Sequence, residues 1–276
     1  MKFAQYSAAL ITVTAALCLS GSFAAAEEAR IELSPLDEAN TIVIRSRDAR
    51  QQLIVTAIAA DGSRTDATRD AEWVISDPSV LEIDSTGMAI PTADGDITVT
   101  ATLGDKTTTA QLAISGFASP LPISFQNQIV PIFTKLGCNG GGCHGKSGGQ
   151  NGFKLSLLGF YPSDDFEFLR KESRGRRIFP AIPGESLLLK KAIGRSPHGG
   201  GKRMEAGSKE YNLLVQWIEQ GMPYGADTDP YVTGIRCVPE TRTMTQKAQQ
   251  QIAVIATYSD GSNEDVTRMA LFEPNE

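Results

Sequence analysis

The chain has 276 residues, of which 41% are hydrophobic and 21% are charged, and its formal net charge is -6. That apolar content is enough for two domain cores and excludes a disordered tail. The acidic balance provides no general basic face, so we expect no nucleic-acid partner. A polytopic membrane protein is excluded as well, because a single apolar run approaches spanning length.

That apolar run lies at the N-terminus. Lys2 precedes the apolar residues 8–19, and small residues follow up to position 26. A basic start, a short apolar stretch and small residues before a cleavage point are typical of a secretory signal. We expect residues 1–26 to be a signal peptide and the mature chain, with charge 25 - 32 = -7, to be exported to the periplasm or cell surface without a transmembrane segment.

Residues 27–117 have the pattern of short β-strands. Apolar and polar residues alternate through 53–57, 97–103 and 110–114, and Asp-Gly and Thr-Gly pairs separate these runs. Glycine suits such hairpins because their turns require a positive φ angle. We predict a small β-sandwich here.

The C-terminal segment repeats part of this pattern 199 residues later. Gln51-Gln52, Asp61-Gly62-Ser63, Asp66 and Thr68-Arg69 return as Gln250-Gln251, Asp260-Gly261-Ser262, Asp265 and Thr267-Arg268. The second copy stops at Glu276, and half a sandwich cannot bury its inner face. We therefore expect residues 231–276 to begin a second sandwich and the chain to be a fragment of a longer protein.

Residues 118–230 change to a helical period. The stretch 115–124 is rich in Gly, Pro and Ser and predicts a linker. Apolar residues at helical spacing, with candidate N-caps, predict several short helices. They are a run from Phe125 to Leu136 that Pro131 kinks or starts, a helix capped by Ser163, one opened by Pro183, and one from Ser208 to Gly221 with Tyr211, Leu214, Trp217 and Ile218 buried. A helical domain with so thin a core would benefit from a cofactor.

The motif CNGGGCHG carries the chemistry of this central segment. Cys138 and Cys143 are separated by four residues, and His144 follows directly. In c-type haem attachment the usual gap is two residues, and the His after the second Cys coordinates iron. Gly140, Gly141 and Gly142 provide backbone freedom for a wider loop to bring both thiols to the ring.

Other uses of the two cysteines stay open at this point. A disulfide between Cys138 and Cys143 is sterically possible in an exported protein. A zinc site needs four ligands, and the segment offers two thiols with His144 and His198. Thiol redox catalysis usually uses a two-residue gap.

Two resemblances follow from these motifs. ADGS at 60–63, WVISDPSVLEID and TVTATLGDKTTTAQLAI resemble group 2 bacterial immunoglobulin-like domains. The stretch from CNGGGCHGKSGGQNGFKLSLLGF to LLVQWIEQGMPYG resembles the cytochrome c-like domain of large exported proteins typical of planctomycetes. The second resemblance implies one covalent haem c, bound at Cys138, Cys143 and His144, and electron exchange with a partner protein that the resemblance does not identify.

The sixth position on the iron has two candidate ligands. His198 lies among glycines that allow close approach to a flat ring, and we expect it to be the metal ligand opposite His144. Met204 is the alternative, whereas Met222 is expected to pack. Arg176, Arg177 and Arg203 are candidates to pair with the haem propionates.

These expectations combine into a multidomain all-β plus all-α protein. We predict a sandwich over 27–117, a cytochrome c-like haem domain over 118–230 and a truncated second sandwich over 231–276. The predicted function is single-electron transfer. A surface adhesion or spacer protein with a disulfide-stapled centre is the alternative, and a haem-dependent enzyme module of a larger protein is another. We expect Cys237, in the second sandwich, to be buried and inert.

Overall fold

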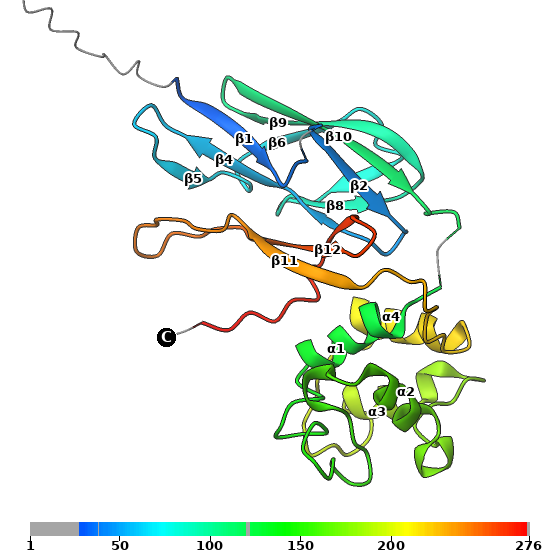
Figure 1. The fold of residues 1–276 in the computed structure, drawn as a ribbon. Helices are drawn as coiled ribbons and strands as arrows, with labels where there is room; N and C mark the ends of the chain where they lie inside the picture. The colour runs from blue at the N-terminus through cyan, green and yellow to red at the C-terminus, as the bar shows by residue number, and fades with distance from the viewer. Residues whose placement is uncertain (1–27, 38, 120–121, 275–276) are drawn as a thin grey trace, which may run out of the picture.

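The computed structural model describes residues 28–37, 39–119 and 122–274. The predicted signal peptide lies outside these residues. No helix in these ranges has both the length and the apolar character needed to cross a bilayer. Figure 1 shows a β-sandwich with a second sheet against it and a group of helices to one side.

The first sandwich is built from strands β1 to β10, as the alternating pattern predicts. Their bounds are β1 Arg30–Ser34, β2 Thr41–Arg45, β3 Gln51–Gln52, β4 Ile54–Ile58, β5 Arg64–Asp66, β6 Glu72–Ile75, β7 Leu81–Ile83, β8 Met88–Pro91, β9 Gly95–Leu103 and β10 Lys106–Ser115. They form sheets in the orders β1-β4-β5, β2-β10-β9-β6 and β3-β8-β7. Alternate side chains such as Leu33, Val55 and Val99 fill the core between the sheets.

The C-terminal segment forms a smaller sheet with the same local structure as the first repeat. Strands β11 Val232–Val238, β12 Ala253–Tyr258 and β13 Asn263–Asp265 are ordered β11-β12-β13, matching β1-β4-β5. Val254 N–H donates to Thr267 Oγ1, just as Val55 N–H donates to Thr68 Oγ1. The sequence repeat is therefore a structural repeat.

Cys237 corrects one prediction, because it is exposed. On β11 it pairs with Val254, the position that Leu33 on β1 takes opposite Val55, and Leu33 is buried. A second sheet covers Leu33 in the first sandwich. Among the described residues no such sheet covers β11, so Cys237 faces solvent.

The two repeats pack against each other through β4 and β12. Ile54 and its repeat equivalent Ala253 are fully buried in a small cluster with Ile255. Gln52 N–H donates to Asp265 Oδ2 at 2.5 Å, and Gln251 N–H donates to Asp66 Oδ2 at 2.5 Å. The contacts are reciprocal, so an approximate two-fold relates the repeats.

The central segment is helical, with its own core. The helices are a π-helix Phe125–Ile129, α1 Val130–Lys135, α2 Pro162–Arg170, α3 Leu187–Ala192 and α4 Lys209–Glu219, with 3-10 turns Leu157–Gly159, Glu172–Gly175 and Pro183–Glu185. Phe125, Trp217 and Leu214 are fully buried at the centre of this core. Lys135 joins the unit to the second repeat through Arg268 O at 2.5 Å.

The helix boundaries confirm some capping predictions and correct others. Ser208 caps α4 by accepting from Tyr211 N–H at 3.3 Å, as predicted. Ser163 is not a cap, because α2 begins one residue earlier at Pro162, whose fixed φ suits the first helical turn. Pro131 likewise stands in the first turn of α1 and starts it after the π-helix.

Candidate functional site

The predicted site residues meet in one cavity of the helical unit. Cys138, Cys143, His144 and His198 all line a hollow of about 570 Å³. Its walls also include apolar side chains from α1 and α3 and from the loop before α2, namely Phe133, Phe153, Leu155, Leu187, Leu188 and Ala192. The fold thus brings His198 into the same cavity as the motif residues Cys138, Cys143 and His144, more than fifty positions earlier in the sequence.

The CNGGGCHG segment forms a tight turn after α1. Gly137 ends the helix with φ of +71°, and Cys138 N–H then donates to Phe133 O at 2.7 Å. His144 N–H donates back to Cys138 O at 3.0 Å, which closes the turn. This backbone bond brings His144 back beside Cys138.

The glycine that the turn requires differs from the three we expected. Gly140, Gly141 and Gly142 have no positive φ, and a Cβ on Gly142 would meet nothing within 4 Å. A Cβ on Gly145 would lie 1.9 Å from Asn139 O. Close packing of backbone on backbone therefore fixes a glycine after His144.

The two imidazoles line the cavity, and each makes a hydrogen bond to a backbone carbonyl through Nδ1. Nδ1 of His144 is 2.9 Å from Phe153 O, and Nδ1 of His198 is 2.8 Å from Gly201 O. A carbonyl can only accept, so Nδ1 carries a proton in each ring, and in a neutral imidazole this leaves Nε2 with the lone pair that binds metals. The ring centroids are 6.3 Å apart and their planes differ by 8°. Near-parallel planes at this separation are a stacked arrangement of the two rings.

Burial and charge set the protonation of the site. Burial, chiefly, lowers the pKa of His144 against the hydrogen bond to Phe153 O, which raises it, and the nearby positive charges of Arg177 and Lys191 add to the lowering. The imidazole is therefore neutral at neutral pH, the form that binds metals. Burial raises the pKa of Cys138 to about 11. A thiol with that pKa is protonated at neutral pH, which makes Cys138 a poor redox nucleophile.

The state of the two cysteines also bears on a disulfide and on a zinc site. Cys138 and Cys143 are free thiols in this structure. In the part of the chain that the structure describes, no group of three or more His, Cys, Asp or Glu side chains is arranged to hold a metal ion. A structural zinc site needs four such ligands together.

The methionines lie away from the cavity. Met204 is buried in the apolar core of the helical unit and does not line the hollow. Met222 packs against the same core, as expected. Of the two predicted sixth ligands, His198 is the one that lines the cavity together with His144.

The three predicted arginines differ in their surroundings. Arg176 is exposed at the cavity wall. Arg203 lies beside the cysteines, with Nη2 3.7 Å from Cys143 Sγ. Arg177 is buried and its guanidinium is bonded to backbone carbonyls, so it is not free to pair with a propionate. Lys191 also lines the cavity and donates to Pro197 O at 2.7 Å, next to His198.

Sequence reasoning missed Phe153 and Lys191 as parts of the site. Phe153 stands nine residues after His144 and supplies the carbonyl for Nδ1. Nothing in its sequence position marks a main-chain acceptor. In the sequence Lys191 is one of many basic residues of the central segment, and its contact with the His198 loop depends on the fold.

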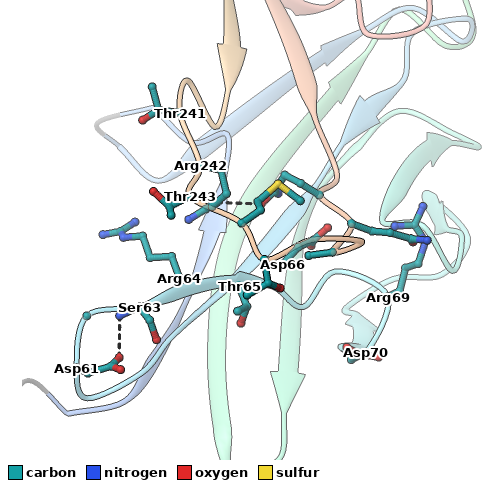
Figure 2. Close-up of a pocket in the computed structure, with 16 residues that line it drawn as sticks. Asp61, Ser63, Arg64, Thr65, Asp66, Arg69, Asp70, Thr241, Arg242 and Thr243 are labelled. Carbon is teal, nitrogen blue, oxygen red and sulfur yellow. Dashed lines mark hydrogen bonds between the residues drawn. The ribbon is translucent and has the colours of Figure 1, made fainter. Parts of the chain in front are cut away.

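A larger hollow, of about 1100 Å³, lies between the two repeats. Figure 2 shows Arg64, Thr65 and Asp66 on β5 beneath the loop that carries Arg242 and Thr243. Arg242 donates to Gln250 within the second repeat and to Thr56 of the first. The hollow has mixed charge, and its contacts join the repeats.

Comparison with known proteins identifies the first sandwich. Residues 36–114 match the family model of the bacterial Ig-like domain (group 2). Ice-binding protein 1 of Shewanella frigidimarina (strain NCIMB 400) is 23% identical over 218 residues, which cover 79% of this chain and 22% of that protein. The chain thus spans about a fifth of the length of this relative. A crystal structure of an intimin mutant from EHEC O157:H7 is 19% identical, with a TM-score of 0.21, over 32% of this chain and 46% of that chain. Residues 36–114 are therefore a bacterial immunoglobulin-like domain of group 2.

Proposed function

We propose that the helical unit of this exported chain binds one covalent haem c and exchanges single electrons with a partner protein. The observation that carries the proposal is the meeting of both thiols and both imidazoles in one cavity, with each Nε2 left free by an Nδ1 hydrogen bond. The apolar walls of the cavity favour burial of the porphyrin ring, and the neighbouring arginines favour its acidic propionate groups. Both features fit the same cofactor.

Each residue has a distinct role in this proposal. Cys138 and Cys143 would attach the ring through thioether bonds, and His144 and His198 would ligate the iron. When bound, the haem supplies an iron that gains and loses one electron. The carbonyls of Phe153 and Gly201 orient the imidazoles, and Arg203 lies close enough to Cys143 to offer its charge beside the ring.

A surface spacer or adhesion role is the second candidate, and the comparisons favour it over electron transfer. The family match covers the first sandwich, and the same local structure recurs in the second repeat. Such domains act as spacers and contact modules rather than as chemical sites. The match supports an extracellular or surface location for either candidate.

The deciding experiment is expression of the full chain with a cytochrome c maturation system. We expect a Soret absorption band that survives denaturation and acid-acetone extraction, and its loss in Cys138→Ala/Cys143→Ala. Cys237→Ala is the matched control, because this exposed thiol lies on β11, outside the helical unit. A colourless wild-type protein would leave the spacer role as the remaining candidate.

A further inference from the structure

Arg177 is a buried cation whose donors are directed at the protein itself. Its exposed fraction is 4%. The guanidinium donates to Phe168 O at 2.8 Å and to Glu172 O at 3.0 Å, and also to Ser173 Oγ at 3.2 Å. A fourth bond goes to Gly152 O. Arg177 therefore joins the end of α2 and the turn that follows it to the loop that begins at Gly152.

The same loop carries the residue that holds His144. Phe153 O accepts the His144 Nδ1 proton at 2.9 Å. The Phe153 ring lies under the guanidinium of Arg177, with 4.5 Å between Cζ and the ring centroid. The same ring contacts His144, at a centroid distance of 4.5 Å. Arg177 is thus one residue removed from the imidazole.

We infer that Arg177 is a positioning residue that fixes the tautomer of His144. By holding Gly152 O and stacking on Phe153, it keeps Phe153 O aimed at Nδ1, so that Nε2 is presented to the cavity. This inference rests on the proposed function, in which His144 Nε2 binds iron. An outer partner that orients a ligating histidine commonly governs metal affinity.

Arginine suits this position better than lysine. The planar guanidinium can bond several carbonyls in its plane while its face stacks on an aromatic ring. The ammonium of lysine offers a point charge with neither property. His198 needs no such support, because its Nδ1 partner Gly201 O lies in its own loop.

The test is the tautomer of His144, read by nitrogen NMR of the histidine rings in the haem-free full chain above the imidazole titration range. We expect the Nδ1–H form of His144 in the wild type and in Arg174→Met, a control at an exposed arginine that does not line the cavity. In Arg177→Met we expect the ratio of the Nδ1–H form to the Nε2–H form of His144 to fall about two- to ten-fold. This is the effect of losing one hydrogen bond, the bond from Nδ1 to Phe153 O. Arg177→Lys should give an intermediate value, and His198 should be unchanged in all variants.

Two outcomes would overturn the inference. One is an unchanged His144 tautomer in Arg177→Met while the fluorescence of buried Trp217 shows an intact core. If Arg177→Met does not fold, Arg177→Lys decides, and a wild-type tautomer in that folded variant would contradict the role. If the matured wild type binds haem, either result overturns the role of Arg177 and leaves the proposed function standing. A colourless matured wild type would instead overturn the proposed function, and with it the purpose assigned to Arg177.

Discussion

Asp66 and Asp265 make the same hydrogen bond to each other's repeat. Asp66 Oδ2 accepts from Gln251 N–H, and Asp265 Oδ2 accepts from Gln52 N–H, both at 2.5 Å. Each carboxylate also caps its own turn, through Thr68 N–H and Thr267 N–H. Each aspartate side chain thus both caps its own turn and joins the two repeats. This double role is a physical reason for the aspartate to occur in both repeats.

We expect Asp66→Ala and Asp265→Ala each to lower the free energy of unfolding by about 1–3 kcal/mol, because each leaves partly buried N–H groups without an acceptor. Urea denaturation measures this. Asp61→Ala is the control, since Asp61 serves an exposed turn through Ser63 N–H, and its effect should stay near 0.5 kcal/mol. If Asp66→Ala and Asp265→Ala each lower the free energy of unfolding no more than Asp61→Ala does, the role of the two aspartates in joining the repeats is contradicted.

The pH dependence of stability is expected to involve Glu264. Burial, chiefly, raises its pKa, and the charge of Asp265 adds to this effect. The folded state therefore binds the proton more tightly than the unfolded state, so ionised Glu264 costs stability above its folded pKa, and this cost disappears as pH falls towards the ordinary range of Glu.

The corresponding variant is Glu264→Gln, which stays neutral at every pH. We expect it to be more stable than the wild type at pH 7, with the difference shrinking as pH falls towards about 4.3. Thermal melts across this range measure the difference. A difference that grows as pH falls would show that Glu264 has a lowered pKa in the folded state.

The glycines of the CNGGGCHG turn offer a matched pair. Gly142→Ala adds a Cβ in open space, whereas Gly145→Ala puts one 1.9 Å from Asn139 O. We expect Gly142→Ala to retain haem loading and Gly145→Ala to lose most of it, because the turn must open to admit the methyl group. Absorbance per polypeptide measures loading. Equal loading in both variants would contradict the turn geometry.

The sixth ligand is tested by His198→Ala and Met204→Leu. We expect His198→Ala to convert a six-coordinate low-spin spectrum into a high-spin one, since His198 faces His144 across the cavity. Met204→Leu should keep the spectrum and cost under about 1.5 kcal/mol, as a volume-conserving core change. Electron paramagnetic resonance distinguishes the spin states. A spectral change confined to Met204→Leu would assign the ligand to Met204 instead.

Local pattern predicted much of the fold and the chemically distinctive members of the site. Alternation gave the sandwich strands, and Ser208 and Pro131 marked helix starts because capping and proline geometry act over a few residues. The repeat pointed to the second sheet. Cys138, Cys143 and His144 could be singled out as candidates because they stand together in a short motif.

Contacts that depend on tertiary structure could not be predicted in this way. Gly145 is required by a backbone approach from Asn139, and Phe153 acts through its main-chain carbonyl. Arg177 looks like any other member of a basic cluster until the fold buries it. Cys237 follows a core pattern, but whether it is buried depends on a covering sheet that a local pattern does not show.

The most direct test of the account is peptide mapping of the matured full chain. Trypsin cleaves after Lys135 and Lys146, which releases residues 136–146 with both thiols and His144. Covalent attachment predicts that mass spectrometry finds one haem added to this peptide through both cysteines. The bare peptide, with two free thiols or one disulfide and no porphyrin mass, would contradict it.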